Sequence, residues 1–147
     1  LEDSHVIPAL IRRFHEATLT GCKSLKVWGS GNVKREFLYS EDIAEGCLHV
    51  MSLSKKALSC KVDPRCSHIN LGAGVDYSIG EVAELIASIT GFKGIIEFDT
   101  SKPDGHPRKL LDVSLAKSLG WQSRIDLKEG LELAYHYYVT QELKQSF

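Results

Sequence analysis

The chain has 147 residues, of which 43% are hydrophobic and 25% are charged. A single domain of this length buries roughly 68–70% of the surface of its unfolded chain, so no disulfide or metal is needed to stabilise it. Lys and Arg total 18 and Asp and Glu total 19, which leaves a net charge of −1. This balance argues against nucleic acid or an anionic membrane as a partner. Any anion-binding site must therefore be local.

Four cysteines are present, and no two of them form a CxxC pair; they are Cys22, Cys47, Cys60 and Cys66. Neither zinc nor a disulfide framework is therefore expected, and the six histidines show no metal-binding spacing. No apolar run is long enough to span a bilayer, and the first residues are acidic where a signal peptide would be basic. We expect a reducing, cytoplasmic location. Because the chain begins with Leu1 rather than Met, we interpret it as part of a longer polypeptide.

The first periodic segment predicts a helix over residues 6–18, with Ser4 as its cap. Pro8 falls in the first turn, where proline is tolerated. The apolar positions recur at helical spacing, and they are Ile7, Leu10, Ile11 and Phe14.

Residues 26–44, KVWGSGNVKREFLYSEDIA, organise the next part of the chain. Short apolar runs predict strands over residues 25–28 and 36–39, separated by a Gly-Ser-Gly turn. Ser40 is a good N-cap for a helix over residues 41–53. We expect its apolar residues to face the core, namely Ile43, Cys47, Val50 and Met51.

Trp28 ends the first of these strands and Arg35 opens the second. A turn that brings a flat ring and a planar cation to one rim would suit a ligand with a base and an anionic tail, such as a nucleoside diphosphate. The alternative is a simple packing or cation–π pair, which is the commoner use of such neighbours.

Residues 55–66 lose all periodicity and predict a mobile loop, and residues 67–72 predict a compact strand. Ser78 and Glu81 form a capping box at the start of a second amphipathic helix, which Gly91 ends. The buried stripe of that helix is expected to consist of Val82, Leu85, Ile86 and Ile89.

A third strand is predicted at residues 95–98, and a charged, proline-containing loop follows at residues 99–109. Two helices, over residues 113–119 and 127–143, close the chain. The core side of the last helix carries Leu131, Tyr135 and Tyr138. Strands that alternate with helices indicate an α/β fold, although they are few for a complete parallel sheet. Some of them are therefore expected to belong to a sheet that extends beyond this chain.

Several side chains could carry chemistry. An imidazole at His5, just before a helix N-terminus, could exchange protons, or it could only support the start of the helix. Arg13 and Arg35 are candidate phosphate ligands, with surface ion pairs as the alternative. Lys109 could meet a diphosphate, and Asp104 could accept hydrogen bonds from a ribose or a base edge, although loop charges are more often only solvated. The glycines form only GxG patterns and make no nicotinamide site by themselves.

Four longer segments resemble the carboxyl-terminal half of the GDP-L-fucose synthase family, which are NADPH-dependent epimerase/reductases of the extended short-chain dehydrogenase type. They are SHVIPALIRRFHEA, VWGSGNVKREFLYSEDIAEG, HINLGAGVDYSIGEVAELI and SKPDGHPRKLLDVSLAKSLGW. The REFLYSEDIA and NLGAG parts are typical of many nucleotide-sugar epimerases and dehydratases. The first and last segments are more selective for the fucose synthases.

The resemblance implies both oxidoreductase and isomerase chemistry on GDP-4-keto-6-deoxy-D-mannose: epimerisation at C3 and C5, then reduction of the C4 ketone by NADPH. It implies an α/β substrate-binding portion that completes a Rossmann-type parallel sheet. It also implies that His5 is an acid/base residue that contacts the nicotinamide. The residues expected to line the GDP-sugar pocket are Val6, Leu10, Arg13, Trp28, Arg35, Asp104 and Lys109.

Residues 1–147 are thus expected to form a substrate-binding region without the amino-terminal NADP-binding half. The glycine-rich loop, the Ser, Tyr and Lys of the reduction step and the catalytic Cys of the family have no match here, so we expect this polypeptide alone to be inactive. The family implies a homodimer for the full-length enzyme. Two alternatives remain: a relative that acts on another sugar nucleotide, and a stand-alone nucleotide-sugar-binding module.

Overall fold

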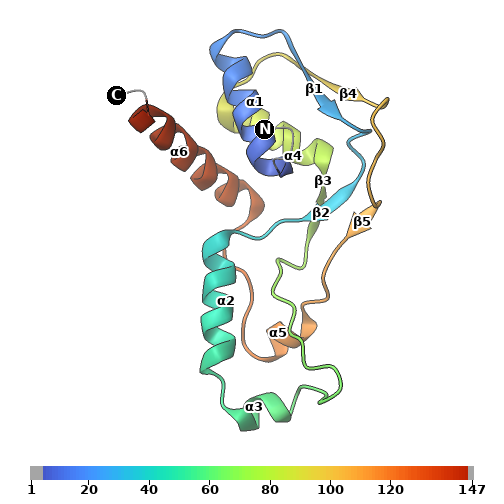
Figure 1. The fold of residues 1–147 in the computed structure, drawn as a ribbon, viewed down its shortest axis with the longest axis vertical. Coiled ribbons are helices and arrows are strands. Elements are labelled where there is room, and N and C mark those ends of the chain that lie inside the picture. Colours follow the sequence, from blue (N-terminus) through green and yellow to red (C-terminus); the bar gives the residue numbers. More distant parts are fainter. Residues whose placement is uncertain (1–4, 146–147) are drawn as a thin grey trace. The chain divides into compact units, whose positions relative to one another are not determined.

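A computed structural model describes residues 5–145, apart from the side chains at positions 142, 144 and 145. The chain forms two compact units. Unit 1 contains the chain up to Lys34, Tyr77–Arg108 and the chain from Leu131 onward. Unit 2 contains Arg35–Asp76 and Lys109–Gly130. Figure 1 shows the elements in chain order, and each unit is described separately below.

Unit 1 is built on a parallel pair of strands, β1 (Ser24–Trp28) and β4 (Ile95–Asp99). Helix α1 (Val6–Leu19) packs against β1 and against α4 (Ile79–Thr90). The two strands pair in register from Ser24 opposite Ile95 to Trp28 opposite Asp99. The predictions of an α/β fold, of a helix at residues 6–18 and of strands at residues 25–28 and 95–98 are confirmed, with α1 one residue longer.

The core of unit 1 follows from the apolar stripes of its two helices. The side chains of Phe14, Val82 and Ile86 are almost completely buried. The ring of Phe14 meets that of Phe92 edge to face, with the centroids 5.3 Å apart. Burial of such side chains contributes about 1.5–3 kcal/mol each relative to exposure. The helical spacing of apolar residues therefore predicted Phe14, Val82 and Ile86 correctly, whereas Leu85 and Ile89 of the predicted stripe are only half-buried.

The helix ends of unit 1 show one confirmed cap and one corrected cap. The Ser78 hydroxyl accepts the Glu81 N–H at 3.1 Å, while the Glu81 carboxylate accepts the Ser78 N–H at 2.7 Å, so the capping box is confirmed. Gly91 ends α4 in the left-handed conformation at φ 75°, as predicted. The N-cap of α1 is His5 and not Ser4, which lies outside the described residues.

A small sheet of three strands has the order β3 (Asp76–Ser78), β2 (Lys34–Glu36) and β5 (Arg108–Lys109). The strand predicted at residues 36–39 is therefore misplaced, since β2 begins earlier and ends at Glu36. The apolar run 37–39 is half-buried but outside the hydrogen-bonded ladder. Apolar sequence alone does not make a strand where a neighbouring strand is too short to pair with it.

The carboxylate of Glu36 joins two loops of unit 2. Its Oε1 accepts the N–H of Gly74 at 2.6 Å, and its Oε2 accepts the N–H of Leu111 at 3.0 Å. Gly72 also lies against this carboxylate, because a Cβ there would come within 2.6 Å of Oε1. One acidic side chain thus fixes two segments that are far apart in the sequence.

Unit 2 contains α2 (Ser40–Ser52), α3 (Lys55–Ser59), α5 (Ser114–Ser118) and the start of α6 (Leu127–Gln145). Helix α2 begins one residue earlier than predicted, so that Tyr39 is its N-cap and Ser40 its first residue. Helix α3 replaces part of the loop predicted at residues 55–66. The final helix is confirmed, with Leu131 buried.

The strand predicted at residues 67–72 does not form. Residues 67–71 have no strand assignment, and within the described part of the chain no other strand pairs with them. Leu71 instead packs toward α2, where its Cδ1 lies 3.1 Å from the position of a Cβ on Gly46. A strand is defined by its neighbour, so an apolar sequence without one stays irregular.

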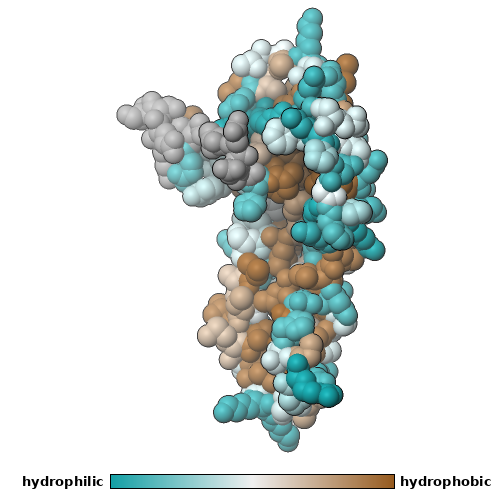
Figure 2. Space-filling model, turned by 45° about the vertical axis from the view of Figure 1, so that its right-hand side comes forward, coloured by the Kyte–Doolittle hydropathy of each residue, from teal (hydrophilic) through white to brown (hydrophobic). Residues whose placement is uncertain are grey.

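The predicted inner face of α2 is also wrong. Ile43 is 45% exposed and Met51 is 80% exposed, and Cys47 is exposed between them, while Val50 is only half-buried. The buried positions of α2 are Asp42 and Gly46. Gly46 faces the ring of Trp121, and a Cβ at this position would lie 2.8 Å from that ring. Only glycine therefore fits at this contact. Figure 2 shows apolar side chains at the surface of unit 2.

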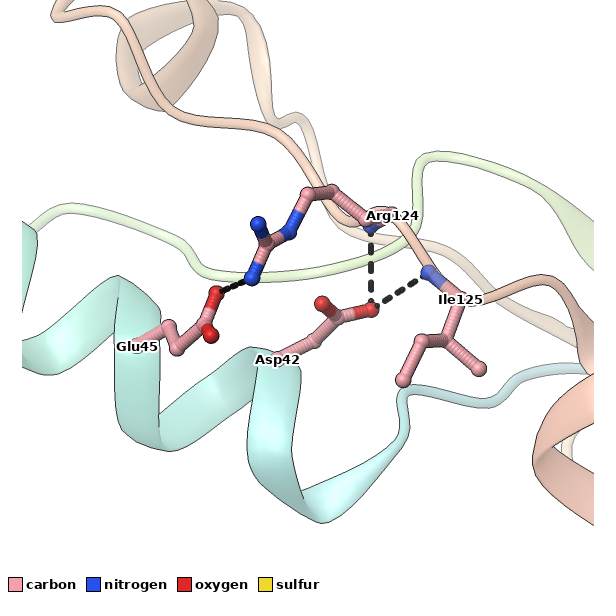
Figure 3. A network of polar contacts seen from close by, with 4 residues as sticks. All are labelled: Asp42, Glu45, Arg124 and Ile125. Carbon is pink, nitrogen blue, oxygen red and sulfur yellow. Dashed lines mark hydrogen bonds and ion pairs between the residues drawn. The ribbon is translucent and has the colours of Figure 1, made fainter. Parts of the chain in front are cut away.

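Asp42 carries the central polar contact of unit 2 (Figure 3). Its side chain is 2% exposed, and its Oδ2 accepts the N–H groups of Arg124 at 3.0 Å and Ile125 at 2.9 Å. The Arg124 guanidinium also pairs with Glu45, one turn further along α2, at the surface. Both contacts connect α2 to the segment that precedes α6.

We expect the two acidic residues of this network to differ sharply in stability. Asp42→Ala removes a buried carboxylate that accepts two partly buried N–H groups, and it should lower the free energy of unfolding by about 1.5–3 kcal/mol. Glu45→Ala removes only an exposed ion pair and should cost about 0–1 kcal/mol. Urea unfolding monitored by circular dichroism measures both. Equal losses would contradict the role given to Asp42.

Candidate functional site

The eight residues predicted to bind substrate or cofactor fall in both units. Unit 1 holds His5, Val6, Leu10, Arg13, Trp28 and Asp104, and unit 2 holds Arg35 and Lys109. The structure therefore brings the first set into one compact body, and the site is described there.

Trp28 and Asp104 approach the same Gly-Ser-Gly turn that follows β1. Both carboxylate oxygens of Asp104 accept hydrogen bonds from Ser30: Oδ1 from the backbone N–H at 2.8 Å, and Oδ2 from the hydroxyl at 2.6 Å. Gly29 has φ +83°, and a Cβ there would lie 2.5 Å from Oδ1 of Asp104. The first glycine therefore supplies both a left-handed turn and the space for the carboxylate.

The electrostatics of this turn favour an ionised carboxylate. The two hydrogen bonds from Ser30 hold the pKa of Asp104 below its ordinary value of 3.8, with the bond from the hydroxyl as the larger cause. The contact is therefore intact at pH values above 3.8 and weakens as the pH falls below it. The pKa of Asp99, opposite Trp28 in the sheet, is lowered chiefly by hydrogen bonds from Ser101 and also by Lys26 and Lys102.

Trp28 offers a broad aromatic surface, since 64% of it is exposed. The ammonium of Lys102 lies 5.6 Å from the centre of its ring. Lys26 lies two positions before Trp28 on the same exposed face of β1. An aromatic ring with an ammonium group beside it can receive a flat base and an adjoining anion.

The α1 residues differ in how much surface they offer. The Arg13 guanidinium donates a hydrogen bond to the carbonyl of Lys26, which holds this half-buried cation beside β1. His5 is exposed at the N-cap and makes no side-chain capping bond. Val6 is half-buried, and Leu10 is only 3% exposed and belongs to the core. Leu10 therefore presents almost no surface to a ligand.

Arg35 and Lys109 lie on the short strands β2 and β5 of the three-stranded sheet. Arg35 is half-buried and Lys109 is exposed. Two hollows of unit 1, about 360 and 410 Å³ in volume, lie elsewhere: the first is lined by residues that include Cys22 and Phe92, and the second lies between α1 and α6. None of the predicted site residues lines them.

Two residues of this site were missed by the sequence pattern, Ser30 and Lys102. The Gly-Ser-Gly turn was recognised only as a flexible connection, although a serine between two glycines offers a hydroxyl and a free N–H to a distant acceptor. Lys102 was one of several charges in a long loop. Only the fold shows that the loop returns to β1.

Two other features of the described residues bear on the kind of site. Among residues 5–145, no group of three or more His, Cys, Asp or Glu side chains is placed to hold a metal ion. No described helix is long and apolar enough to cross a membrane.

Comparison with known proteins gives concordant matches. A model of the NAD dependent epimerase/dehydratase family matches residues 1–72. The chain is 50% identical over 137 residues to GDP-L-fucose synthase of Escherichia coli (strain K12), which is 93% of this chain and 43% of that protein. It is similar to the crystal structure of a GDP-6-OMe-4-keto-L-xylo-heptose reductase from C. jejuni, with a TM-score of 0.85 and 37% identity, over 94% of this chain and 48% of that one.

A third match is a crystal structure of a GDP-L-fucose synthetase from Naegleria fowleri bound to NADP. Its TM-score is 0.74 with 30% identity, over 95% of this chain and 41% of that one. The chain thus spans about 40% of the length of the curated relatives it matches. The expected resemblance is confirmed, and so is the α/β fold class.

The close approach at Gly29 leads to a stability prediction with a matched control. Gly29→Ala places a side chain in a left-handed conformation and against Asp104, so it should lower the free energy of unfolding by about 2–3 kcal/mol. Gly21→Ala also has positive φ, at +64°, but nothing lies within 4 Å, so it should cost only about 1 kcal/mol. Urea unfolding compares the two variants.

Gly29→Ala should lose more stability than Gly21→Ala only while the Asp104 carboxylate is present. In an Asp104→Ala background, Gly29→Ala should cost no more than Gly21→Ala, because only the backbone strain remains. An excess that persists in this background would show that the Asp104 carboxylate is not its cause.

Proposed function

We propose that this chain, a relative of the GDP-L-fucose synthases and of the NAD dependent epimerase/dehydratase family, forms the GDP-sugar-binding part of such an enzyme. The complete enzyme would convert GDP-4-keto-6-deoxy-D-mannose to GDP-L-fucose, by epimerisation at C3 and C5 and NADPH-dependent reduction at C4. The observation that carries the proposal is the 50% identity to the Escherichia coli synthase over 93% of the chain. The geometry of unit 1 supports it.

In this proposal, Trp28 receives the guanine base, because its ring is open to solvent at the rim of the sheet. Arg13, Arg35 and Lys109 are assigned to the diphosphate, since guanidinium and ammonium groups form charge-assisted hydrogen bonds to phosphate oxygens. Val6 and Leu10 form the apolar side of the pocket. Asp104 stands at the edge of the same site, beside the turn that follows Trp28.

His5 is assigned to the acid/base steps of the epimerisation and to contact with the nicotinamide. The imidazole is exposed and unused by the helix cap, which leaves its nitrogens free for proton transfer. An imidazole in this position can accept a proton during enolate formation. Cations on the diphosphate would hold the sugar while this exchange occurs.

NADPH would supply the hydride for the C4 reduction, and the described residues do not form its main binding site. Gly29 and Gly31 follow β1 but lead into β2, and Gly72 and Gly74 lead into β3. A dinucleotide fold instead needs the glycines to open directly into a helix whose N-terminus faces the pyrophosphate. We therefore assign NADPH mainly to a separate amino-terminal half and propose that residues 1–147 are inactive alone.

The exposed side of α2 supports the existence of that second half. Its apolar residues have helical spacing, which normally indicates a buried face, yet they lie at the surface of unit 2. The extended segment 67–71 beside Gly46 also lacks a strand partner within the described chain. We propose that a nucleotide-binding sheet covers both, that the assembled enzyme is a homodimer, and that it acts in the cytoplasm, where the four free thiols would stay reduced.

A second candidate function is favoured by one comparison. The likeness to a GDP-heptose reductase at a TM-score of 0.85 supports a relative that acts on another GDP-sugar. The base-binding part of the site would then be unchanged and only the sugar pocket would differ. A stand-alone nucleotide-sugar-binding module remains the third possibility.

Calorimetry with the purified chain tests the ligand class. We expect GDP to bind more tightly than UDP, because a purine covers more of the Trp28 ring than a pyrimidine does. Arg35→Ala should weaken GDP binding by about 1.5–3 kcal/mol through loss of a charged hydrogen bond. Arg124→Ala, which removes an arginine already paired with Glu45, is the control and should leave affinity unchanged. Equal affinity for GDP and UDP would count against guanine recognition.

Reconstitution tests the proposed division into two halves. This chain should show no NADPH oxidation with the keto-sugar alone, and activity should appear when it is co-expressed with the part of the Escherichia coli relative that it does not match. Leu48→Glu on the exposed face of α2 should abolish co-purification, because a charge would enter an apolar interface.

Leu19→Glu provides the matched control for reconstitution. Leu19 is 74% exposed on α1, comparable with Leu48 at 66%, and its substitution should leave co-purification intact. Turnover by the isolated chain would refute its inactivity, and equal behaviour of the two variants would remove α2 from the interface.

A further inference from the structure

We propose that Ser30 is a positioning residue: through Asp104 it holds the loop at residues 99–108 against β1, so that Lys102 lies over Trp28 and can bind the phosphate of a nucleotide stacked on that ring. The sequence pattern assigned no role to Ser30 or Lys102. The inference deepens the proposed GDP-sugar site and rests on it for the identity of the ligand.

The orientation of Ser30 is determined on three sides. Its backbone N–H and its hydroxyl both donate to Asp104, and its hydroxyl oxygen accepts the N–H of Asn32 at 3.1 Å. The hydroxyl therefore donates and accepts at once, which leaves it a single productive rotamer. Ser30 and Asp104 are separated by 74 positions, so these hydrogen bonds join two segments that are far apart in the sequence.

The contact with Ser30 adds a second role to the one expected for Asp104. Each of its carboxylate oxygens already accepts one hydrogen bond from the turn. The lowered pKa of this carboxyl agrees with an acceptor that is engaged in the free protein. Asp104 therefore holds the loop in the free protein, and its remaining lone pairs are still available for a ribose or a base edge, the role predicted from the sequence.

The same loop places Lys102 two residues before Asp104. Its ammonium lies 5.6 Å from the centre of the Trp28 ring, within the range of a cation–π contact. The backbone N–H of Lys102 also bonds the carbonyl of Asp99 at 3.2 Å, which ties the start of the loop to the end of β4. The loop is thus fixed on both sides of Lys102, by Asp99 before it and Asp104 after it.

This arrangement holds the Trp28 ring and the Lys102 ammonium close together before a nucleotide binds. Most of the Trp28 ring remains exposed, so a purine can stack on it while the flexible ammonium reaches a phosphate oxygen. If the loop were released, the cation would have to be ordered during binding, which costs affinity. Ser30 therefore affects nucleotide binding without touching the nucleotide.

The first test needs no ligand. Acrylamide quenching of tryptophan fluorescence reports mainly on Trp28, because the other tryptophan, Trp121, is only 7% exposed. Ser30→Ala should increase quenching, because Lys102 then leaves the ring. Ser30→Thr keeps the hydroxyl and should give the original value. In a Lys102→Met background, Ser30→Ala should no longer change the quenching. Unchanged quenching in Ser30→Ala would overturn the positioning role, whether or not the chain binds GDP.

Ser78→Ala is the matched structural control. Ser78 also donates its N–H and its hydroxyl to a single carboxylate, that of Glu81, at 2.7 and 2.8 Å in the same unit. Its removal should lower stability to a similar extent, without any change in Trp28 quenching. A change in quenching equal to that of Ser30→Ala would show that general loosening of unit 1 is the cause.

The second test measures coupling in ligand binding by calorimetry. Lys102→Met should weaken GDP binding about 10- to 150-fold, as expected for a charged hydrogen bond, while guanosine, which lacks phosphate, should bind equally well. Ser30→Ala should weaken GDP binding up to about tenfold, and the double variant should be no weaker than Lys102→Met alone. Additive losses would overturn the claim that Ser30 acts through Lys102.

These outcomes separate the two proposals. If neither GDP nor guanosine binds the unaltered chain, the proposed function fails, while the quenching series still decides whether Ser30 positions the loop. If GDP binds and Lys102→Met has no effect, the phosphate role of Lys102 fails, while the proposed function stands.

Discussion

The candidate site depends on one carboxylate that accepts hydrogen bonds from a glycine-bounded turn. Asp104 and Ser30 join the turn after β1 to a charged loop, whose far end is also held by the Pro107 carbonyl accepting the Lys34 N–H. Unit 2 uses the same device twice, where Asp42 and Glu36 each accept two backbone N–H groups from distant segments. Such acceptors order irregular chain that cannot pair in a sheet, and their loss leaves polar groups unsatisfied. Strands and a helix carry most of the candidate site residues, and side-chain carboxylates hold the loops beside them.

The surface of unit 2 carries apolar side chains that the packing inside unit 2 does not bury. Helix α2 turns a glycine and an aspartate inward and leaves a stripe of apolar side chains outward. Burying a single leucine-sized side chain contributes about 1.5–3 kcal/mol, so such a stripe favours association with another apolar surface. Together with the share of its relatives that the chain covers, this supports the proposed second half.

The proposed division of labour follows from what each segment can hold. Unit 1 offers an exposed ring, several cations and an unengaged imidazole, which suit an anionic nucleotide-sugar and proton exchange. The turn at Gly29 and Gly31 leads into a strand rather than a helix, so it lacks the N–H array that binds a dinucleotide pyrophosphate. Substrate recognition and hydride transfer are thus assigned to different parts of a longer enzyme.

The amino-acid sequence by itself determined the elements whose signals are local: α1, α4 with its capping box, the parallel strands of unit 1, and the core residues Phe14, Val82 and Ile86. Periodicity and capping depend on residues three or four positions apart, so they can be read directly. Only the tertiary structure decided which face of α2 is buried, that residues 67–72 form no strand, and that Ser30 meets Asp104. The first and the last depend on a partner distant in the sequence, namely Trp121 against Gly46 and a loop 74 positions from Ser30. The second depends on whether another strand lies alongside, and none of the described residues supplies one. Local patterns carry no information about such partners, because the chain brings them together only when it folds.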